Sequence, residues 1–216
     1  MNRYLAVLLL GMVIAGCGKS NSPTEPSSTN TSVLIPLSTG NKWIYRTTYT
    51  DIDGQVLSTT IDSSYIGLSV YVNGLKYYFY NTQGSDTQSD IRLFRNTSEG
   101  VIQLDEHSQT EVLEFKYPAK AGEIYTISSN EFSSFSVNME VVSIDTEITT
   151  QKGTFMCYEY RPSASERINS ISDIFIAPNV GIVREVEANA PFDNGGSPDP
   201  LFGVTKERML IDAEIR

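Results

Sequence analysis

The stretch Ser134-Phe135-Ser136-Val137-Asn138-Met139-Glu140-Val141 decides the fold class of this chain. Its polar and apolar residues alternate strictly, so in an extended backbone the four apolar side chains share one face and the polar ones share the other. This pattern is typical of a strand in an antiparallel sheet that packs on a core with one face and meets water with the other. We therefore expect an all-β protein.

The same alternation recurs along the chain. In residues 42–51, Trp43, Tyr45 and Tyr49 share one face, and the turn sequences Asp51-Ile52-Asp53-Gly54 and Asn73-Gly74 mark hairpins. Further strands are predicted at 55–72, 75–81, 90–96, 101–105, 110–117, 123–128, 133–145, 147–152, 154–161, 171–177, 181–188 and 204–212. Many short strands with few long connections predict one large antiparallel curved sheet, a half-barrel or open barrel, with a β-sandwich as the alternative.

The beginning of the chain is typical of an export signal. Arg3 precedes an apolar run that is too short for the roughly 20 residues of a membrane-spanning helix. The run ends in Ile14-Ala15-Gly16-Cys17, which resembles the lipobox of bacterial lipoproteins. That resemblance implies cleavage before Cys17 and acylation of this residue, for example with palmitate. Residues 1–16 are thus expected to be a lipoprotein signal peptide and Cys17 the lipidation site.

The next residues predict a tether followed by one domain. Residues 17–32 comprise the lipidated cysteine and a linker rich in Ser, Thr, Asn and Pro, which contains too little apolar surface to form a core. Residues 33–216 are expected to form a single β-rich domain. Its other cysteine, Cys157, has no cysteine partner and is expected to be a small buried apolar residue in a strand.

Charge and motifs narrow the function. The chain has 16 Lys and Arg against 26 Asp and Glu, a formal net charge of −10, which argues against binding nucleic acid. The only histidine, His107, is expected in a polar turn, and the oxygen-rich loop at residues 193–199 is a weak candidate for calcium. No catalytic motif is present, so we expect no enzyme, cofactor or metal; an enzyme without a recognisable motif is the remaining alternative.

Tyrosines supply candidate binding residues. If Tyr77 and Phe79 face inward, Tyr78 and Tyr80 must face outward, where they could stack on a sugar or contact a partner. A carbohydrate-binding module at the cell surface is therefore one alternative function. The inner faces of the strands that carry Trp43 and Phe135 are the candidate contacts for an apolar ligand.

Three stretches resemble a family of uncharacterised exported bacterial proteins. Residues 35–45, IPLSTGNKWIY, are similar to its PLxxGNxWxY opening, residues 152–158, KGTFMCY, to its GTFxCY strand, and residues 175–183, FIAPNVGIV, to its APGVGxV hairpin. Asn179 replaces a glycine of the last motif and is compatible with a turn, because asparagine tolerates a positive φ. The resemblance implies an envelope protein with a curved sheet similar to that of periplasmic lipoprotein carriers.

These observations predict a lipid-anchored envelope lipoprotein with a non-catalytic binding or structural role. Its membrane contact is the lipid on Cys17, and its expected partner is a lipid, another apolar ligand or an envelope protein. Gly18 is not the Asp that retains lipoproteins at the inner membrane in enterobacteria, so the outer membrane is the expected location in a Gram-negative cell.

Overall fold

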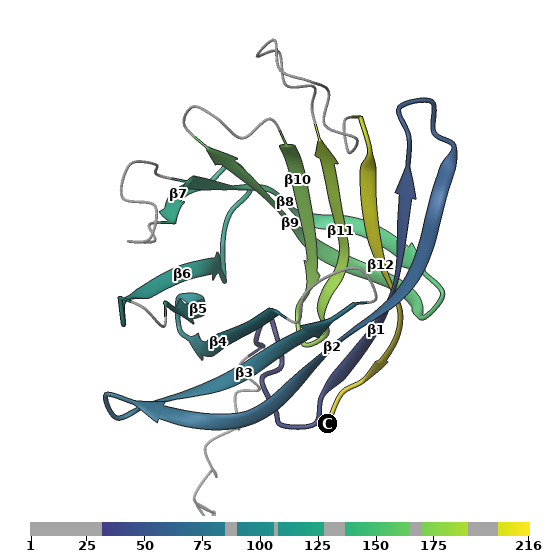
Figure 1. Cartoon of the computed structure of the whole chain (residues 1–216). Coiled ribbons are helices and arrows are strands. Elements are labelled where there is room, and N and C mark those ends of the chain that lie inside the picture. Colours follow the sequence, from purple (N-terminus) through teal and green to yellow (C-terminus); the bar gives the residue numbers. More distant parts are fainter. Residues whose placement is uncertain (1–31, 85–89, 106–107, 128–136, 165–169, 190–202) are drawn as a thin grey trace, which may run out of the picture. The chain divides into compact units, whose positions relative to one another are not determined.

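The computed structural model describes residues 32–84, 90–105, 108–127, 137–164, 170–189 and 203–216. These residues form twelve strands and no helix, all in one antiparallel sheet that curves into a nearly closed barrel (Figure 1). The strands are β1 (Lys42–Thr50), β2 (Val56–Val72), β3 (Leu75–Gln83), β4 (Asp90–Thr97), β5 (Gly100–Leu104), β6 (Glu111–Lys116), β7 (Ile124–Ile127), β8 (Val137–Thr150), β9 (Gly153–Ala164), β10 (Ser170–Ala177), β11 (Gly181–Asn189) and β12 (Thr205–Glu214). In this part of the chain, no helix is long and apolar enough to cross a membrane.

The sheet consists of two six-stranded meanders. Strands β1 to β6 and β7 to β12 each pair with their neighbours in sequence, and antiparallel pairing of β1 with β12 joins the two halves. The predicted all-β fold with a large curved sheet is confirmed. The β-sandwich alternative is wrong, because all twelve strands belong to one continuous sheet.

One predicted boundary is wrong. The segments 133–145 and 147–152 were expected to be separate strands, but Val137–Thr150 is a single strand, β8, paired with β9. Shifts in its register between Val141 and Thr146 accommodate the break in alternation, as β-bulges do. Strand β8 also contacts β11 and β12, which are not its neighbours in the sheet, and Lys152 at the hairpin tip forms an ion pair with Asp212.

Side chains bridge the two strands at the ends of the sheet, β6 and β7. The hydroxyl of Tyr125 on β7 accepts a hydrogen bond from the backbone N–H of Lys116 at 3.1 Å and donates to the carbonyl of Glu114 at 3.0 Å. Lys116 also forms an ion pair with Glu123. These contacts satisfy backbone groups of β6 that a neighbouring strand would otherwise pair.

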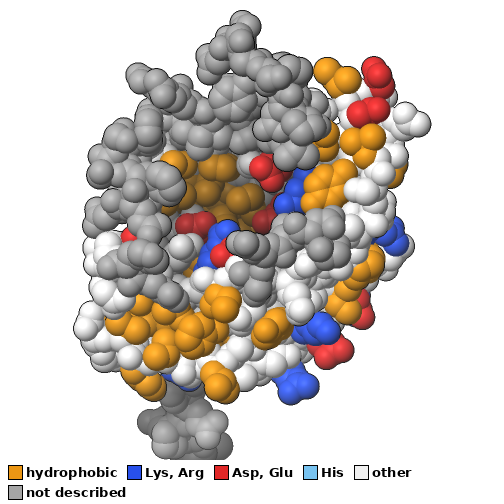
Figure 2. Space-filling view, in the orientation of Figure 1, with side chains coloured by type: hydrophobic (Ala, Val, Ile, Leu, Met, Phe, Trp, Pro, Cys, Tyr) orange, Lys and Arg blue, Asp and Glu red, His pale blue; other side chains and the backbone are white. Residues whose placement is uncertain are grey.

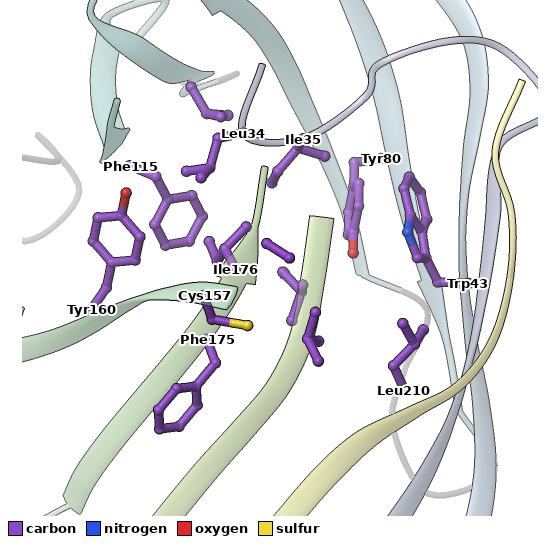
Figure 3. Close-up of a cluster of buried hydrophobic side chains, with 14 of the residues drawn as sticks. Leu34, Ile35, Trp43, Tyr80, Phe115, Cys157, Tyr160, Phe175, Ile176 and Leu210 are labelled. Carbon is purple, nitrogen blue, oxygen red and sulfur yellow. The ribbon is translucent and has the colours of Figure 1, made fainter. Parts of the chain in front are cut away.

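Most of the main core lies inside the curved sheet and at one end of it, whereas Phe175 lies on the face that it shares with its cross-strand partner Arg184. Figure 3 labels ten of its members, which come from both meanders and from the segment before β1: Leu34, Ile35, Trp43, Tyr80, Phe115, Cys157, Tyr160, Phe175, Ile176 and Leu210. Hydrogen bonds from both meanders hold the segment before β1. The side chain of Asn96 donates to the carbonyl of Ile35, and the backbone N–H of Asn179 donates to the carbonyl of Val33. Residues 32–37 therefore close this end of the barrel.

The recognised sequence motifs have structural roles at the closed end. The fully buried Asn41 donates from its side chain to the carbonyl of Pro36 and accepts from the N–H of Arg216. Asn179 has a φ of 62°, and Val180 donates to the carbonyl of Ala177 across the turn. The expectation that asparagine suits this turn is confirmed.

Candidate functional site: a charged lumen

Strand alternation brings charged side chains inside the barrel. In the β11–β12 pair, Glu185 faces Arg208 and Glu187 faces Lys206. Arg208 lies two residues from Leu210, a member of the main core, so these four charged residues share the inner face. Arg184 and Glu207 alternate with them, and their 2.7 Å ion pair is therefore on the outer face.

Arg208 is the most buried charge of this inner face. Its Nη1 donates to Glu185 at 2.7 Å, its Nη2 donates to the hydroxyl of Ser64 at 2.8 Å, and its Cζ lies 3.6 Å from the centroid of the Tyr45 ring. Its side chain is 9% exposed. Burial opposes the positive charge, but the neighbouring Glu185 carboxylate raises the pKa of Arg208 above its ordinary value, so the guanidinium stays charged.

Strands β4 and β6 contribute charges to the same interior. Arg92 pairs across the sheet with the buried Tyr80, which places it on the inner face, and it contacts Asp90 at 2.8 Å and Glu114 at 3.9 Å. Burial raises the pKa of the Glu114 carboxyl, and the opposing effect of Arg92 is smaller. This side of the interior therefore combines a solvent-accessible arginine with a carboxyl group whose pKa is raised by burial.

Between these groups lies a cavity of about 240 Å³, here called the charged lumen. It is lined by Arg92, Ser172, Asp173, Ile174, Glu185, Val186, Glu187, Lys206 and Arg208. Figure 2 shows acidic and basic side chains gathered in a hollow of the molecule, in the orientation in which Figure 1 looks into the barrel. Its lining thus offers hydrogen-bond donors and acceptors of both charge signs.

One donor in this lining has no acceptor. The Nε atom of Arg208 is buried and makes no hydrogen bond within the part of the chain that the structure describes. A buried N–H without an acceptor costs about 1–3 kcal/mol, so such groups are rare unless water or a ligand completes them. Arg208 itself is held by Glu185, Ser64 and Tyr45, so the unpaired donor is its Nε–H, and that atom has almost no exposed surface.

The predicted inward and outward faces of β3 are reversed. Tyr80, expected outside, is 5% exposed and packs between Trp43 and Phe94, with ring centroids 6.0 and 5.4 Å apart. Tyr78 is half-buried against the same core. Tyr77, expected inside, belongs to a separate cluster on the other face with Leu93 and Leu104, and its hydroxyl donates to Glu111. Alternation shows which residues share a face, but not which face becomes the interior.

Other sequence candidates have different outcomes. Trp43 is 1% exposed and donates from Nε1 to the carbonyl of Val180 at 2.6 Å, so it serves the core. Cys157 is fully buried in β9, as predicted. Phe135, His107 and the loop 193–199 lie outside the described residues.

The charged lumen was missed at the sequence level. The sequence pattern that could have revealed it is a pair of like charges, two residues apart, in each of the last two strands. These pairs are Glu185 with Glu187 and Lys206 with Arg208. Opposite charges at both positions suggest paired strands, but the same pattern is common on solvent-facing sheets. Among the described residues, no group of three or more His, Cys, Asp or Glu side chains could hold a metal ion.

Comparisons with known proteins give structural similarity only. No family model matches the chain, and no curated protein matches it. A Bacteroides fragilis protein described as exported and with a YmcC-like fold is 14% identical, with a TM-score of 0.48, over 85% of this chain and 99% of its own. A Parabacteroides distasonis protein described as a lipoprotein is 13% identical, with a TM-score of 0.39 and the same coverage. Similarities at this level support no inference about ligand or activity.

Proposed function

We propose that this protein is a lipid-anchored, non-catalytic binding protein of the bacterial cell envelope, and that it binds a small polar molecule in the charged lumen. The observation that carries the proposal is a cavity of about 240 Å³ whose lining combines the buried Arg208 with the carboxylates of Asp173, Glu185 and Glu187. This volume is below the roughly 300–1,000 Å³ of sites for drug-sized ligands, which favours a smaller molecule.

The closed end of the barrel suits an anchored protein. Ser32, where the described part of the chain begins, accepts a hydrogen bond from Tyr117 at this end, and the β10–β11 turn is beside it. Strand β11 starts at that turn and carries Glu185 and Glu187 toward its other end. The segment that leads from a lipid on Cys17 would therefore join the domain at this end, with the outer membrane as the proposed location.

A polar ligand fits this interior better than an acyl chain. The apolar side chains of the inner face already pack against one another, as Trp43, Tyr80 and Phe94 do. An apolar ligand in the charged lumen would instead remove ion-paired groups from water without replacing their hydrogen bonds, which is unfavourable. We therefore propose a polar molecule in place of the lipid expected from the sequence.

A second candidate function is contact with an envelope protein. Strand β2 carries exposed large apolar side chains along its length: Val56, Leu57, Ile61, Tyr65, Leu68 and Tyr71. Such concentrations of exposed apolar residues often mark interaction surfaces. Crosslinking from Leu68, which is 75% exposed, would test this contact independently of the lumen.

Native mass spectrometry of the full-length chain, extracted from membranes in mild detergent, tests the main proposal. We expect a lipid-modified Cys17 and the additional mass of a small polar molecule, which Arg208→Lys loses and Arg184→Lys retains. A bound acyl lipid would contradict the polar lumen. The proposal also fails if no mass is found and no member of a library of small polar metabolites raises the thermal midpoint.

A further inference from the structure

We infer that the tip of the β2–β3 hairpin docks on the anionic phospholipid surface of the membrane that holds the lipid on Cys17. Leu68, Tyr71 and Leu75 then lie in the headgroup region. The inference rests on the lipid anchor of the proposed function and adds a second membrane contact, which the folded domain itself makes. It follows from where the hairpin projects, from its exposed side chains and from its charge.

The β2–β3 hairpin projects beyond the closed end of the barrel. The hydroxyl of Thr39, just before β1, donates to the carbonyl of Gly67 at 2.9 Å, so β2 passes the start of β1 at this point. Strand β2 pairs with β1 as far as Tyr65, whereas residues 69–72 pair with β3. The turn Asn73-Gly74, with φ of 51° and 80°, closes the hairpin. Figure 1 shows it reaching past the start of β1, at the end of the barrel where the C-terminus lies.

The chain from the lipid enters the domain at this same end. The hydroxyl of Ser32 accepts a hydrogen bond from the side chain of Asn179, and the neighbouring carbonyl of Val180 accepts one from Trp43 at the start of β1. Even when fully extended, the chain between Cys17 and Ser32 spans at most about 50 Å. The lipid therefore keeps the closed end, and with it the hairpin, within reach of the headgroups.

The hairpin exposes large apolar and aromatic side chains. Leu68 is 75% exposed, Tyr71 is 69% exposed and Leu75 is 43% exposed. Tyr71 pairs across the hairpin with Lys76, and Leu75 pairs with Val72, so the two faces of the tip each carry one of these side chains. Figure 2 shows hydrophobic side chains gathered at the lower left of the view, where Figure 1 places this hairpin. A tyrosine suits the headgroup region because its ring is apolar and its hydroxyl stays hydrated.

The charge of the hairpin suits an anionic surface. Residues 63–85 contain no Asp or Glu and a single cation, Lys76, although the chain has 26 acidic residues and a net charge of −10. Exposed apolar side chains elsewhere adjoin acidic residues: Ile61 precedes Asp62, and Ile52 lies within Asp51-Ile52-Asp53. An anionic lipid surface repels such sites but not the hairpin.

The other charged groups at the closed end balance one another, so they do not oppose docking. Lys42 lies opposite Glu214 in the β1–β12 pairing, and Lys116 forms an ion pair with Glu123. These groups are the cations Lys42, Lys116, Lys120 and Arg216 and the acidic Glu99, Glu123, Glu214 and the carboxylate of Arg216. Lys76 therefore leaves this end with one more cation than acidic groups.

Fluorescence quenching by lipids tests the inference on the lipidated full-length protein. The protein is reconstituted into vesicles of phosphatidylcholine and phosphatidylglycerol that carry a quencher near the headgroups. A fluorophore is attached at Ser69→Cys, beside the tip, or at Ser58→Cys, an exposed position toward the other end of β2. Cys157 is fully buried, so the introduced thiol is the one that reacts. We expect the lipids to quench the probe at residue 69 but not the probe at residue 58.

Variants that carry the probe at residue 69 identify the contacts. Tyr71→Ser combined with Leu75→Ser removes exposed apolar surface and should lower the ratio of docked to undocked protein by about tenfold or more. Ile61→Ser removes a 57% exposed side chain of the same strand away from the tip, and should dock like the wild type. If the double variant fails to fold, Lys76→Glu at an exposed position should weaken docking for its charge alone. Vesicles of phosphatidylcholine alone should also give weaker docking.

An unquenched probe at residue 69, on protein that floats with the vesicles, would overturn the inference and leave the lipid anchor intact. Equal docking of the double variant and Ile61→Ser would also overturn it, as would docking on phosphatidylcholine alone that is equally strong. If the probe responds in native membranes but not in protein-free vesicles, the hairpin contacts an envelope protein and the inference is wrong. If the protein does not float with the vesicles, the proposed anchor is wrong as well.

Discussion

The guanidinium of Arg208 lies over the ring of Tyr45, with 3.6 Å between its Cζ atom and the ring centroid. The two residues come from opposite ends of the domain's sequence, and the pairing of β1 with β12 brings them together. The aromatic face leaves the edges of the guanidinium directed at Glu185 and Ser64. This stack marks the boundary between the apolar core and the charged lumen.

Replacement of Arg208 by Met should strongly destabilise the domain. The change leaves Glu185 partly buried without its cation, and loss of one partner of a buried pair costs about 3–5 kcal/mol. Adding Glu185→Leu should recover a large part of this loss. Urea unfolding measures both effects, and Arg184→Met, which breaks an outer-face pair, should lose only about 0–1 kcal/mol. Equal losses for the two single variants would contradict the buried pair.

Tyr125→Phe should loosen the contact between β6 and β7. The phenol makes two hydrogen bonds to the backbone of β6, and its loss leaves the N–H of Lys116 without that acceptor. We expect a loss of about 1–3 kcal/mol and faster amide exchange at Lys116, read by hydrogen-exchange mass spectrometry. Tyr65→Phe, on the exposed part of β2, is the control. Unchanged exchange at Lys116 would show that this bridge is unimportant.

Glu114→Gln should change how stability depends on pH. Because burial raises the pKa of Glu114, the stability contributed by its protonated form is present below the unfolded pKa of about 4.3 and is lost as pH rises through the folded pKa. The uncharged glutamine has no proton to lose. The stability of the variant minus that of the wild type should therefore be larger at neutral pH than at pH 4.

Glu123→Gln provides a control of opposite sign. A hydrogen bond from Lys116 lowers the pKa of Glu123, so its stabilising contribution is present above the unfolded pKa and lost as pH falls through the folded pKa. We compare the thermal midpoint of each variant with that of the wild type from pH 4 to 8. Between pH 4 and neutral pH, this difference should rise for Glu114→Gln and fall for Glu123→Gln. A shift of the same sign would contradict the burial of Glu114.

Cys157 should not react in the folded protein. Its side chain is fully buried, and burial raises the pKa of the thiol to about 12. In a Cys17→Ser variant, a disulfide reagent at pH 8 should label Cys157 only as fast as the domain unfolds, and completely in urea. Rapid labelling without denaturant would show that β9 opens locally.

Much of the fold could be predicted because its strands and turns are encoded locally. The side chain of Asp51, for example, accepts hydrogen bonds from the N–H groups of Asp53 and Gln55 and forms the predicted turn within five residues. The boundary expected near residue 146 was wrong because the bulges of β8 depend on its pairing with β9. No local pattern specifies that partner.

The sequence by itself determined the β-strands, the positions of most turns, the shared face of Trp43 and Tyr45, and the burial of Cys157 in a strand. The tertiary structure decided that Tyr80 is inside and that Glu185 and Arg208 face a cavity. The physical reason is that a period of two assigns residues to the same face, whereas closure of the sheet determines which face is enclosed. Arg208 becomes a buried group of the lumen only through Tyr45, Ser64 and Glu185, which come from three other strands.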